Sequence, residues 1–321
     1  MIETRLTERF GLTHPILSAP MASAAGGRLA AAVTRAGGLG FIGGSYCDAD
    51  WIAREFAEAG NEAVGCGFIT WVLAKAPSLL DEVLARKPRA VFLSFGDPAP
   101  FVDRIATAGV PLICQVQTLR DARHAAGLGA TVIVAQGAEA GGHGQARATM
   151  TLVPEVADWL AQAHPDTLLV AAGGIGDGRG LAAALMLGAD GVLVGSRLWA
   201  SEEALVPPAM HAAAVAATGD GTIQSKVMDV ARRLDWPERY ACRVLRNAFT
   251  DRWHDDPVGL QAAVEAEAPK WAAAFAAGDP QGANTFVGEV TGLIGGVAPA
   301  AEIVAGMVAG AEALLDGGWR R

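Results

Sequence analysis

Short hydrophobic runs alternate with amphipathic segments along the first two thirds of the chain. Eight runs predict strands, because they are rich in β-branched residues and unbroken by charge, as strands buried on both faces must be. They span residues 16–19, 39–42, 63–69, 90–95, 112–116, 131–135, 168–172 and 191–194. The intervening segments predict helices over residues 29–36, 51–59, 79–86, 101–108, 119–127, 156–163 and 181–187.

Eight successive β–α units are typical of a closed (β/α)₈ TIM barrel, an α/β fold with parallel strands. A doubly wound open sheet is the alternative, and it usually has fewer strands. We therefore expect the barrel.

More than a hundred residues follow the last predicted strand. Pro207 and Pro208 break the chain there, and an alanine-rich segment with clustered charges and aromatic residues follows. We expect residues 206–284 to form a smaller helical insertion over the barrel mouth, with an apolar face that includes some of Trp236, Tyr240 and Trp253 and helps to close the mouth. The barrel would comprise residues 1–205 and 285–321, with a last helix over residues 299–315.

The charge balance limits the partners. The chain of 321 residues has a formal net charge of −9 and no basic stripe, so we expect no nucleic-acid partner. Residues 297–315 are long and apolar enough to suggest a membrane span, but they contain Pro299, Glu302 and Glu312. A helix packed on protein is the better interpretation, and we expect no membrane association.

The four cysteines are Cys47, Cys66, Cys114 and Cys242, and none forms a C-x-x-C pair. They are typical of reduced thiols rather than disulfides or metal ligands, so we expect a cytoplasmic protein without a metal site.

Two glycine-rich segments follow the seventh and eighth predicted strands. Residues 173–178 read Gly-Gly-Ile-Gly-Asp-Gly, and residues 195–197 read Gly-Ser-Arg. Backbone N–H groups of such loops, each leading toward a helix, can hold an anion. Because the phosphate site of many TIM barrels lies at these two strands, the pattern predicts phosphate binding.

Polar or unusual side chains follow other strands. Pro20 and Met21 end the first strand, where a fixed backbone and a polarisable side chain suit a flat ring. Gln115 and Gln117 share one face of the fifth strand and need polar partners. A flavin pyrimidine edge would supply these partners.

The loop after the sixth strand contains a candidate catalytic residue. His143 lies among glycines in residues 141–144, where it is poorly placed for core packing and well placed to face a substrate. Glu139 is expected to hold this loop through backbone N–H groups. The other histidines are expected to be structural: His14, His124, His164, His211 and His254.

These motifs together resemble nitronate monooxygenases, formerly called 2-nitropropane dioxygenases. The resemblance rests on the Pro-Met of the first strand and on residues 136–144, 171–180 and 195–197. It covers nearly all of the barrel and resumes over residues 288–294. The E-A-G-G-H segment over residues 139–143 also resembles flavin-dependent enoyl-acyl carrier protein reductases and NADH:quinone reductases.

The resemblance implies noncovalent FMN and a residue-by-residue assignment of its site. Ala19, Pro20, Met21 and Ala22 would line the flavin, Gln115 and Gln136 would contact its ring or ribityl chain, Gly141 and Gly142 would approach the ring, Gly173, Gly174, Gly195 and Ser196 would hold the phosphate, and His143 would be catalytic. One departure is Gly67, where many relatives place an asparagine.

The implied activity is FMN-dependent oxidation of alkyl nitronates by O₂ to carbonyl compounds and nitrite, with neutral nitroalkanes as a second candidate substrate. The expected partners are the small-molecule nitronate and O₂, with a homodimer as one candidate assembly. His143 would either remove the α-proton or bind the nitro group as imidazolium, since its ordinary pKa near 6.5 permits both roles.

Three alternatives remain at this point. An NAD(P)H-dependent flavin reductase of the same superfamily acts on a quinone or an enoyl thioester and needs no separate dinucleotide motif. A barrel resembling inosine-monophosphate dehydrogenase would need a nucleophilic cysteine in residues 137–144, which contain none. A phosphate-binding barrel without catalysis would leave His143 unexplained.

Overall fold

The computed structural model describes residues 2–44, 46 and 48–318. Eight parallel strands form one sheet in the order β1-β9-β8-β6-β5-β4-β3-β2. Their bounds are β1 (Ile16–Ser18), β2 (Phe41–Gly43), β3 (Gly65–Ile69), β4 (Val91–Ser94), β5 (Leu112–Val116), β6 (Val132–Gln136), β8 (Leu168–Ala172) and β9 (Gly191–Val194). A parallel bridge between Leu17 and Leu39 joins the two ends of the sheet and closes the barrel. The predicted (β/α)₈ barrel is confirmed.

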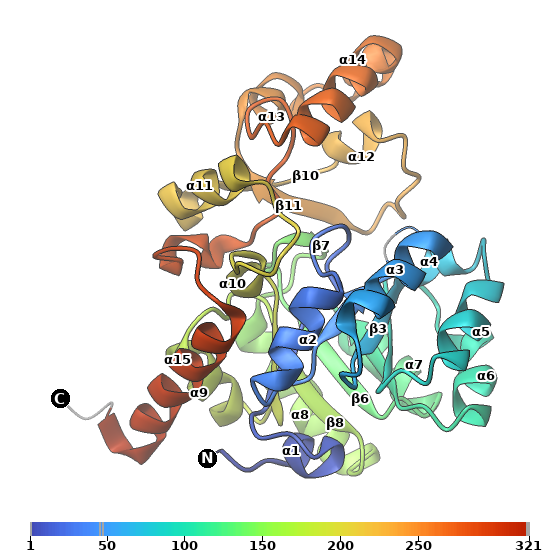
Figure 1. The fold of residues 1–321 in the computed structure, drawn as a ribbon, viewed down its shortest axis with the longest axis vertical. Coiled ribbons are helices and arrows are strands. Elements are labelled where there is room, and N and C mark those ends of the chain that lie inside the picture. The colour runs from blue at the N-terminus through green and yellow to red at the C-terminus, as the bar shows by residue number, and fades with distance from the viewer. Residues whose placement is uncertain (1, 45, 47, 319–321) are drawn as a thin grey trace.

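Helices follow the strands and form the outer ring (Figure 1). They are α2 (Gly27–Arg35), α3 (Ala49–Ala59), α5 (Ser78–Ala85), α6 (Val102–Thr107), α7 (Leu119–Gly127), α8 (Thr149–Ala163), α9 (Gly178–Met186) and α15 (Ala300–Ala313). Short helical segments are α1 (Arg5–Phe10), α4 (Thr70–Leu73), η1 (Ala99–Phe101), α10 (Ser196–Trp199) and η4 (Leu314–Gly318).

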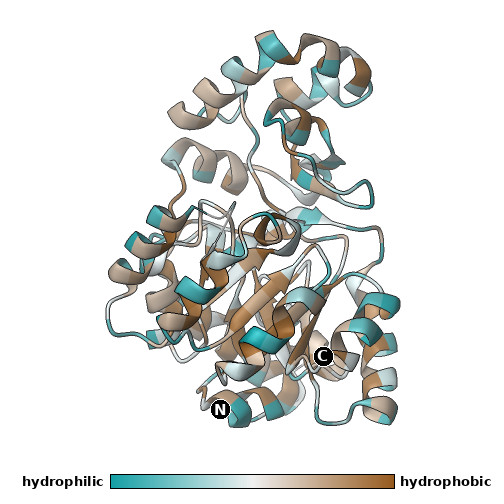
Figure 2. Ribbon diagram, turned by 90° about the vertical axis from the view of Figure 1, so that its right-hand side faces the viewer, coloured by the Kyte–Doolittle hydropathy of each residue, from teal (hydrophilic) through white to brown (hydrophobic). Residues whose placement is uncertain are grey.

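Two apolar layers hold the barrel together. Leu17, Phe92 and Val134 belong to a buried cluster inside the barrel, which Leu6 and Phe10 of α1 join. A larger cluster lies between strands and helices and includes residues of α15, such as Val304 and Val308. The hydrophobic strands occupy the centre of the barrel in Figure 2, with hydrophilic positions on the surrounding helices.

The segment after β9 forms a second layer over one end of the barrel (Figure 1). It contains α11 (Pro208–Ala216), η2 (Gly219–Gly221), β10 (Thr222–Ser225), α12 (Val227–Ala231), β11 (Ala241–Leu245), α13 (Ala248–Trp253) and α14 (Pro257–Ala277). η3 (Glu289–Leu293) follows before the chain returns to the barrel. We call residues 206–284 the cap; its own apolar core includes Trp253, Leu260 and Trp271.

The cap is not entirely helical, which corrects the expectation from sequence. β10 and β11 are antiparallel, and β11 also pairs with β7 (Gly142–Gly144), a short strand in the loop after β6. The two cap strands show alternating burial, with Ile223, Ser225, Cys242 and Val244 inside. This small sheet therefore joins the cap to a barrel loop.

The described part of the chain has no helix that is both long and apolar enough to cross a membrane. The apolar segment near the C-terminus is α15, which packs on α9 and α2. Cys114 and Cys242 are buried free thiols, Cys66 is also buried, and Cys47 lies outside the described residues.

Candidate active site

A cavity opens at the carboxyl ends of the barrel strands, beneath the cap. Barrel residues form its floor and walls, and the cap contributes residues such as Arg232, Trp236 and Phe275. All of the site residues that the sequence singled out line this one cavity: Ala19, Pro20, Met21, Ala22, Gln115, Gln136, Gly141, Gly142, His143, Gly173, Gly174, Gly195 and Ser196. Segments from the ends of five barrel strands, β1, β5, β6, β8 and β9, therefore meet here, as expected for this fold.

Bare backbone forms much of the wall. A side chain at Gly142 would meet nothing within 4 Å, and one at Gly195 would meet only the Ala19 Cβ, at 3.7 Å. Both glycines therefore face open space. Gly173 and Gly174 have φ angles of 99° and 73°, which side-chain-bearing residues rarely adopt, so glycine is needed in this turn.

The helix that follows this turn is already capped. The Asp177 carboxylate accepts hydrogen bonds from the backbone N–H groups of Arg179 and Gly180, at 2.9 and 3.2 Å. The first turn of α9 is therefore occupied by a protein anion. An anionic ligand would have to use the loop residues themselves rather than this helix terminus.

The departure at Gly67 has a steric explanation. A Cβ at this position would lie 2.4 Å from Pro20 Cβ and 2.5 Å from Pro20 Cγ. The Pro20 ring therefore fills the space that a side chain from β3 would need. An asparagine here would require the end of β1 to move.

Three glutamines form a connected group, of which Gln115 and Gln136 line the cavity. Gln115 Nε2 and Gln117 Nε2 both donate to Gln136 Oε1, at 3.1 and 2.7 Å. Gln136 Nε2 donates to the His143 carbonyl, at 3.2 Å. This network fixes the amide orientations and connects β5 and β6 to the strand that carries His143.

His143 lies on β7 and is held from the cap. Its Nε2 is 3.0 Å from both carboxylate oxygens of Asp229, and both side chains are buried. Its ring stacks on Trp236, with 3.4 Å between ring centroids and 7° between planes. Because a carboxylate only accepts, Nε2 carries the proton in neutral His143, which leaves Nδ1 as the basic nitrogen.

Burial lowers the pKa of His143 below its ordinary value. The hydrogen bond and charge of Asp229 favour the protonated ring and offset part of this effect, while the charge of Arg232 lowers the pKa further. The neutral ring is therefore the favoured form near neutral pH.

The sequence reasoning did not identify several residues around His143. Asp229 is 86 positions away along the chain, so no local spacing could reveal it. Phe95 was assigned only to a strand, yet it has a φ of 62° and its ring contacts His143 and Trp236. The closely spaced glycines around His143 were the local signal that marked this residue.

Several other side chains that the sequence singled out make structural contacts. Both Glu139 carboxylate oxygens accept from the Thr149 N–H, at 3.1 Å, so Glu139 does hold the loop. His211 Nε2 lies 2.9 Å from the Trp199 carbonyl, and His254 Nδ1 lies 3.0 Å from Ser225 Oγ. Trp253 lies in the cap core, whereas Trp236 reaches the cavity.

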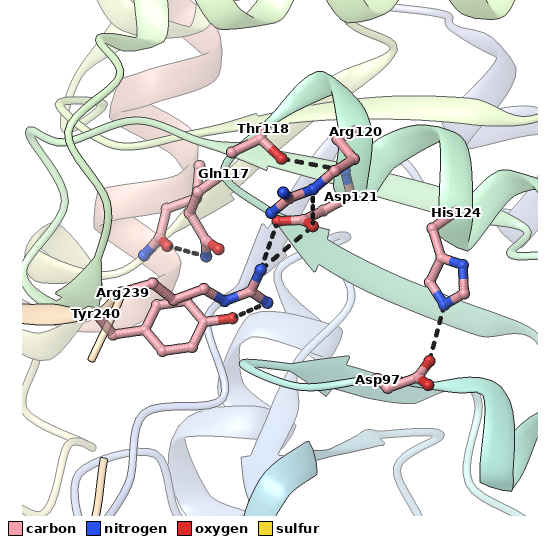
Figure 3. A network of polar contacts seen from close by, with 9 residues as sticks. Asp97, Gln117, Thr118, Arg120, Asp121, His124, Arg239 and Tyr240 are labelled. Atoms are coloured by element: carbon pink, nitrogen blue, oxygen red, sulfur yellow. Dashed lines mark hydrogen bonds and ion pairs between the residues drawn. The ribbon is translucent and has the colours of Figure 1, made fainter. Parts of the chain in front are cut away.

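A second, polar cavity lies beside the first and shares Gln115 with it. Figure 3 shows its polar contacts: Arg239 of the cap pairs with Asp121, and His124 pairs with Asp97 at 2.8 Å. Its charged groups are thus largely paired with one another. They connect the cap to the start of α7.

A family model described as nitronate monooxygenase matches residues 3–82 and 73–310 of the chain. Nitronate monooxygenase of Neurospora crassa is 34% identical over 94% of this chain and 90% of that protein. Nitronate monooxygenase npaC of Metarhizium robertsii is 35% identical over 90% of this chain and 88% of that protein.

Solved structures show the same architecture. FabK from Thermotoga maritima aligns with a TM-score of 0.88 and 29% identity, covering 98% of each chain. Nitroalkane oxidase from Streptomyces ansochromogenes aligns with a TM-score of 0.80 and 25% identity, covering 95% of this chain and 98% of that one. The family match spans both barrel and cap, and both of the related fungal enzymes are nitronate monooxygenases. The chain therefore belongs to the nitronate monooxygenase family, and it is an oxidoreductase.

Proposed function

We propose that the protein oxidises alkyl nitronates with O₂, using noncovalent FMN, to give carbonyl compounds and nitrite. The observation that carries the proposal is the buried His143–Asp229 pair in a glycine-walled cavity at the barrel mouth. Family membership supports a flavin cofactor and nitronate oxidation.

The shape and chemistry of the cavity fit FMN. Gly142 and Gly195 leave open space where a flat ring and its side chain can approach the backbone. Gln115 and Gln136 supply polar atoms beside it, and the loops at Gly174 and Ser196 are the candidate phosphate site. When bound, FMN would accept electrons from the nitronate and react with O₂.

His143 would handle the proton. With Nε2–H directed at Asp229, Nδ1 can accept the α-proton of a neutral nitroalkane. Asp229 stabilises the imidazolium that results and holds the ring in place. A preformed nitronate has already lost this proton, so it needs only binding and orientation at the same place.

Replacement of His143 by Asn tests this role, because Asn keeps a hydrogen-bond donor but cannot titrate near neutral pH. We expect kcat/KM for neutral nitroalkanes to fall by about 10²–10⁴ and that for preformed nitronates to fall much less. His164→Asn, at the end of α8, is the control. A higher KM for nitronates, most clearly below the His143 pKa, would instead assign anion binding, and unchanged kinetics would make His143 structural.

A second candidate is an NAD(P)H-dependent reductase. FabK aligns over 98% of both chains, and a carboxyl-CoA dehydrogenase of Rhodococcus jostii is 32% identical over 73% of this chain. Anaerobic mixing of the holoenzyme separately with a nitronate, NADH and NADPH distinguishes the two. Rapid bleaching of the flavin by a nitronate alone supports our proposal, whereas bleaching only by a nicotinamide contradicts it.

A further inference from the structure

Trp236 of the cap packs directly on the side chain of His143. The indole lies flat on the imidazole, with 3.4 Å between ring centroids and 7° between ring planes. Asp229 holds the same imidazole through Nε2, so the ring is fixed both at one edge and on one face. A base whose ring cannot turn keeps its Nδ1 directed at one place in the cavity.

Aromatic rings from the barrel and the cap surround the indole of Trp236. The rings of Trp71 and Phe95 meet it edge to face, at centroid distances of 5.5 and 5.2 Å, and the Tyr240 ring lies 6.1 Å away. Edge-to-face pairs of this kind are favourable and fix the orientation of the rings. The position of Trp236 is therefore set from both parts of the chain.

The indole N–H of Trp236 contacts a second polar group of the cavity, the Tyr46 hydroxyl. Trp236 Nε1 lies 3.3 Å from Tyr46 Oη. Because an indole N–H can only donate, Tyr46 Oη accepts this hydrogen bond and keeps its own proton for another partner. That proton has no acceptor among the residues that the structure describes, and Tyr46 lines the active-site cavity. The hydroxyl is therefore available to a ligand atom in the cavity.

Tyr46 is a neutral donor near neutral pH. Burial raises its pKa, and the charge of Arg232, whose guanidinium lies 4.8 Å from the Tyr46 ring centroid, opposes this rise. The phenol therefore keeps its proton, while the nearby cation strengthens it as a donor. Asn284 also lines the cavity from the cap, but its Oδ1 accepts from Trp271 Nε1 at 2.8 Å, so it is held independently of Trp236.

We propose that Tyr46 donates a hydrogen bond to the nitro group of the substrate and that Trp236 is the positioning residue for both Tyr46 and His143. This inference rests on the proposed oxidation of nitronates and adds to the residues of that site. The acidic carbon and the nitro oxygens of a nitroalkane are two bonds apart. A base and a donor held by one indole can therefore engage both.

The proton transfer balances at these groups. His143 Nδ1 takes the α-proton, the electron pair of the C–H bond forms the C=N bond of the nitronate, and an N=O electron pair moves onto oxygen. Tyr46 keeps its proton and donates a hydrogen bond to that oxygen, where the negative charge develops. A preformed nitronate already carries this charge, so it uses Tyr46 but not the basicity of His143.

Kinetics on the two substrate forms of nitroethane test the role of Tyr46 in the holoenzyme. Tyr46→Phe should lower kcat/KM for nitroethane and for its preformed nitronate alike, by about 10- to 100-fold, the range for a hydrogen bond to a charged group. Tyr240→Phe is the matched control, because the Tyr240 hydroxyl accepts from Arg239 at the second cavity. This variant should match the wild type with both forms.

Variants of Trp236 separate its two contacts. Trp236→Phe keeps an aromatic face for His143 but removes the N–H that orients Tyr46, so kcat/KM should fall for both substrate forms. This loss should disappear in the Tyr46→Phe background, where no hydroxyl remains to be oriented. Trp236→Leu also removes the aromatic face, and its further loss, up to about 10²-fold, should fall on nitroethane and spare the nitronate. Trp159→Leu, which removes a tryptophan of α8 in contact with His164, should change neither rate.

Exchange of the α-protons of nitroethane for deuterium provides a readout that needs no oxidation. It is followed by NMR with the holoenzyme under anaerobic conditions. The enzyme should catalyse this exchange, and Tyr46→Phe and Trp236→Leu should slow it as they slow the turnover of nitroethane.

The outcomes separate the two proposals. If no nitronate is oxidised but the exchange depends on Tyr46 and Trp236, the proposed oxidation is wrong and the positioning role stands. Wild-type rates in Tyr46→Phe overturn the positioning role even where oxidation proceeds. A Trp236→Phe loss of the same size in the Tyr46→Phe background overturns it too, because the indole would then act without Tyr46. Equal losses for nitroethane and its nitronate in Trp236→Leu would also overturn it, since they would assign Trp236 a purely structural role.

Discussion

At the scale of single residues, the Asp229 carboxylate favours the protonated form of His143. Burial lowers the His143 pKa and Asp229 offsets part of that effect. Replacement of Asp229 by Asn removes the offset, so the His143 pKa should fall further. Activity that requires neutral His143 rises with pH through this pKa, so its acidic limb should move to lower pH.

The limiting rate with neutral nitroalkanes should fall at the same time, by about 10²–10⁴, because the proton is no longer fixed on Nε2. Profiles of kcat/KM against pH for wild type and Asp229→Asn measure both effects. A limb that moves to higher pH, or a rate that stays the same, would contradict the assigned pairing.

Gly195 allows a clean test of the phosphate site. A Cβ at this residue makes only an ordinary contact with Ala19, so Gly195→Ala should keep its flavin. Gly195→Asp adds a carboxylate where the phosphate is expected, and like-charge repulsion should yield a colourless protein. Flavin absorbance per mole of purified protein measures this. Equal flavin content in the two variants would place the phosphate elsewhere.

Residues at strand ends were predictable from sequence, because a barrel places those ends together whatever the details of packing. That logic brought Pro20, Gln136 and Gly195 to one cavity. It could not find Asp229 or Asn284, because their places depend on how the cap folds. Nor could it explain Gly67, whose neighbour Pro20 comes from a different strand.

At the scale of elements, the stability of the cap should depend on the buried N-terminus of α13. Asn247 caps α13, where its Oδ1 accepts from the Thr250 N–H, and its Nδ2 donates to the carbonyls of Pro280 and Ala283. Asn247→Ala should lower the free energy of unfolding by about 2–4 kcal/mol, combining a lost cap with unpaired buried carbonyls.

The matched control is Asp256, the N-cap residue of α14. Its carboxylate accepts from the Gly259 N–H at the surface. Asp256→Ala should cost about 1 kcal/mol. Urea unfolding of the two variants provides the comparison. Equal losses would mean that the Asn247 contacts with residues 280–283 add nothing.

The barrel strands were predicted well because unbroken apolar runs are visible without tertiary information; β5, β8 and β9 have the predicted bounds. α8 begins at Thr149, seven residues before its predicted start, because Pro154 near its first turn obscured the helical pattern. β10 and β11 were missed because they are short and half exposed, and β11 pairs with a strand 97 positions away that contains two glycines.

At the scale of the whole molecule, the Arg239–Asp121 pair connects the cap to the barrel at the second cavity (Figure 3). The two side chains are 39% and 21% exposed, so solvent weakens their attraction. A double-mutant cycle with Arg239→Gln and Asp121→Asn should give a coupling below about 1 kcal/mol that shrinks with added salt. A coupling above about 2 kcal/mol would show that cap docking depends on this pair.

The pairing of β7 with β11 has a consequence for how substrate enters. The three residue pairs of this ladder include His143 with Cys242, so the backbone of His143, the proposed base, is paired with a strand of the cap. If the cap swung outward as a rigid lid, it would pull His143 away from the barrel. The proposed base would then be displaced from the cavity while water entered. Local displacement of residues 232–240, the segment between α12 and β11 that carries Trp236, would admit substrate without moving His143. Amide exchange in β7 and β11 that is slow compared with turnover would support local entry, and exchange that keeps pace with turnover would favour the swinging lid.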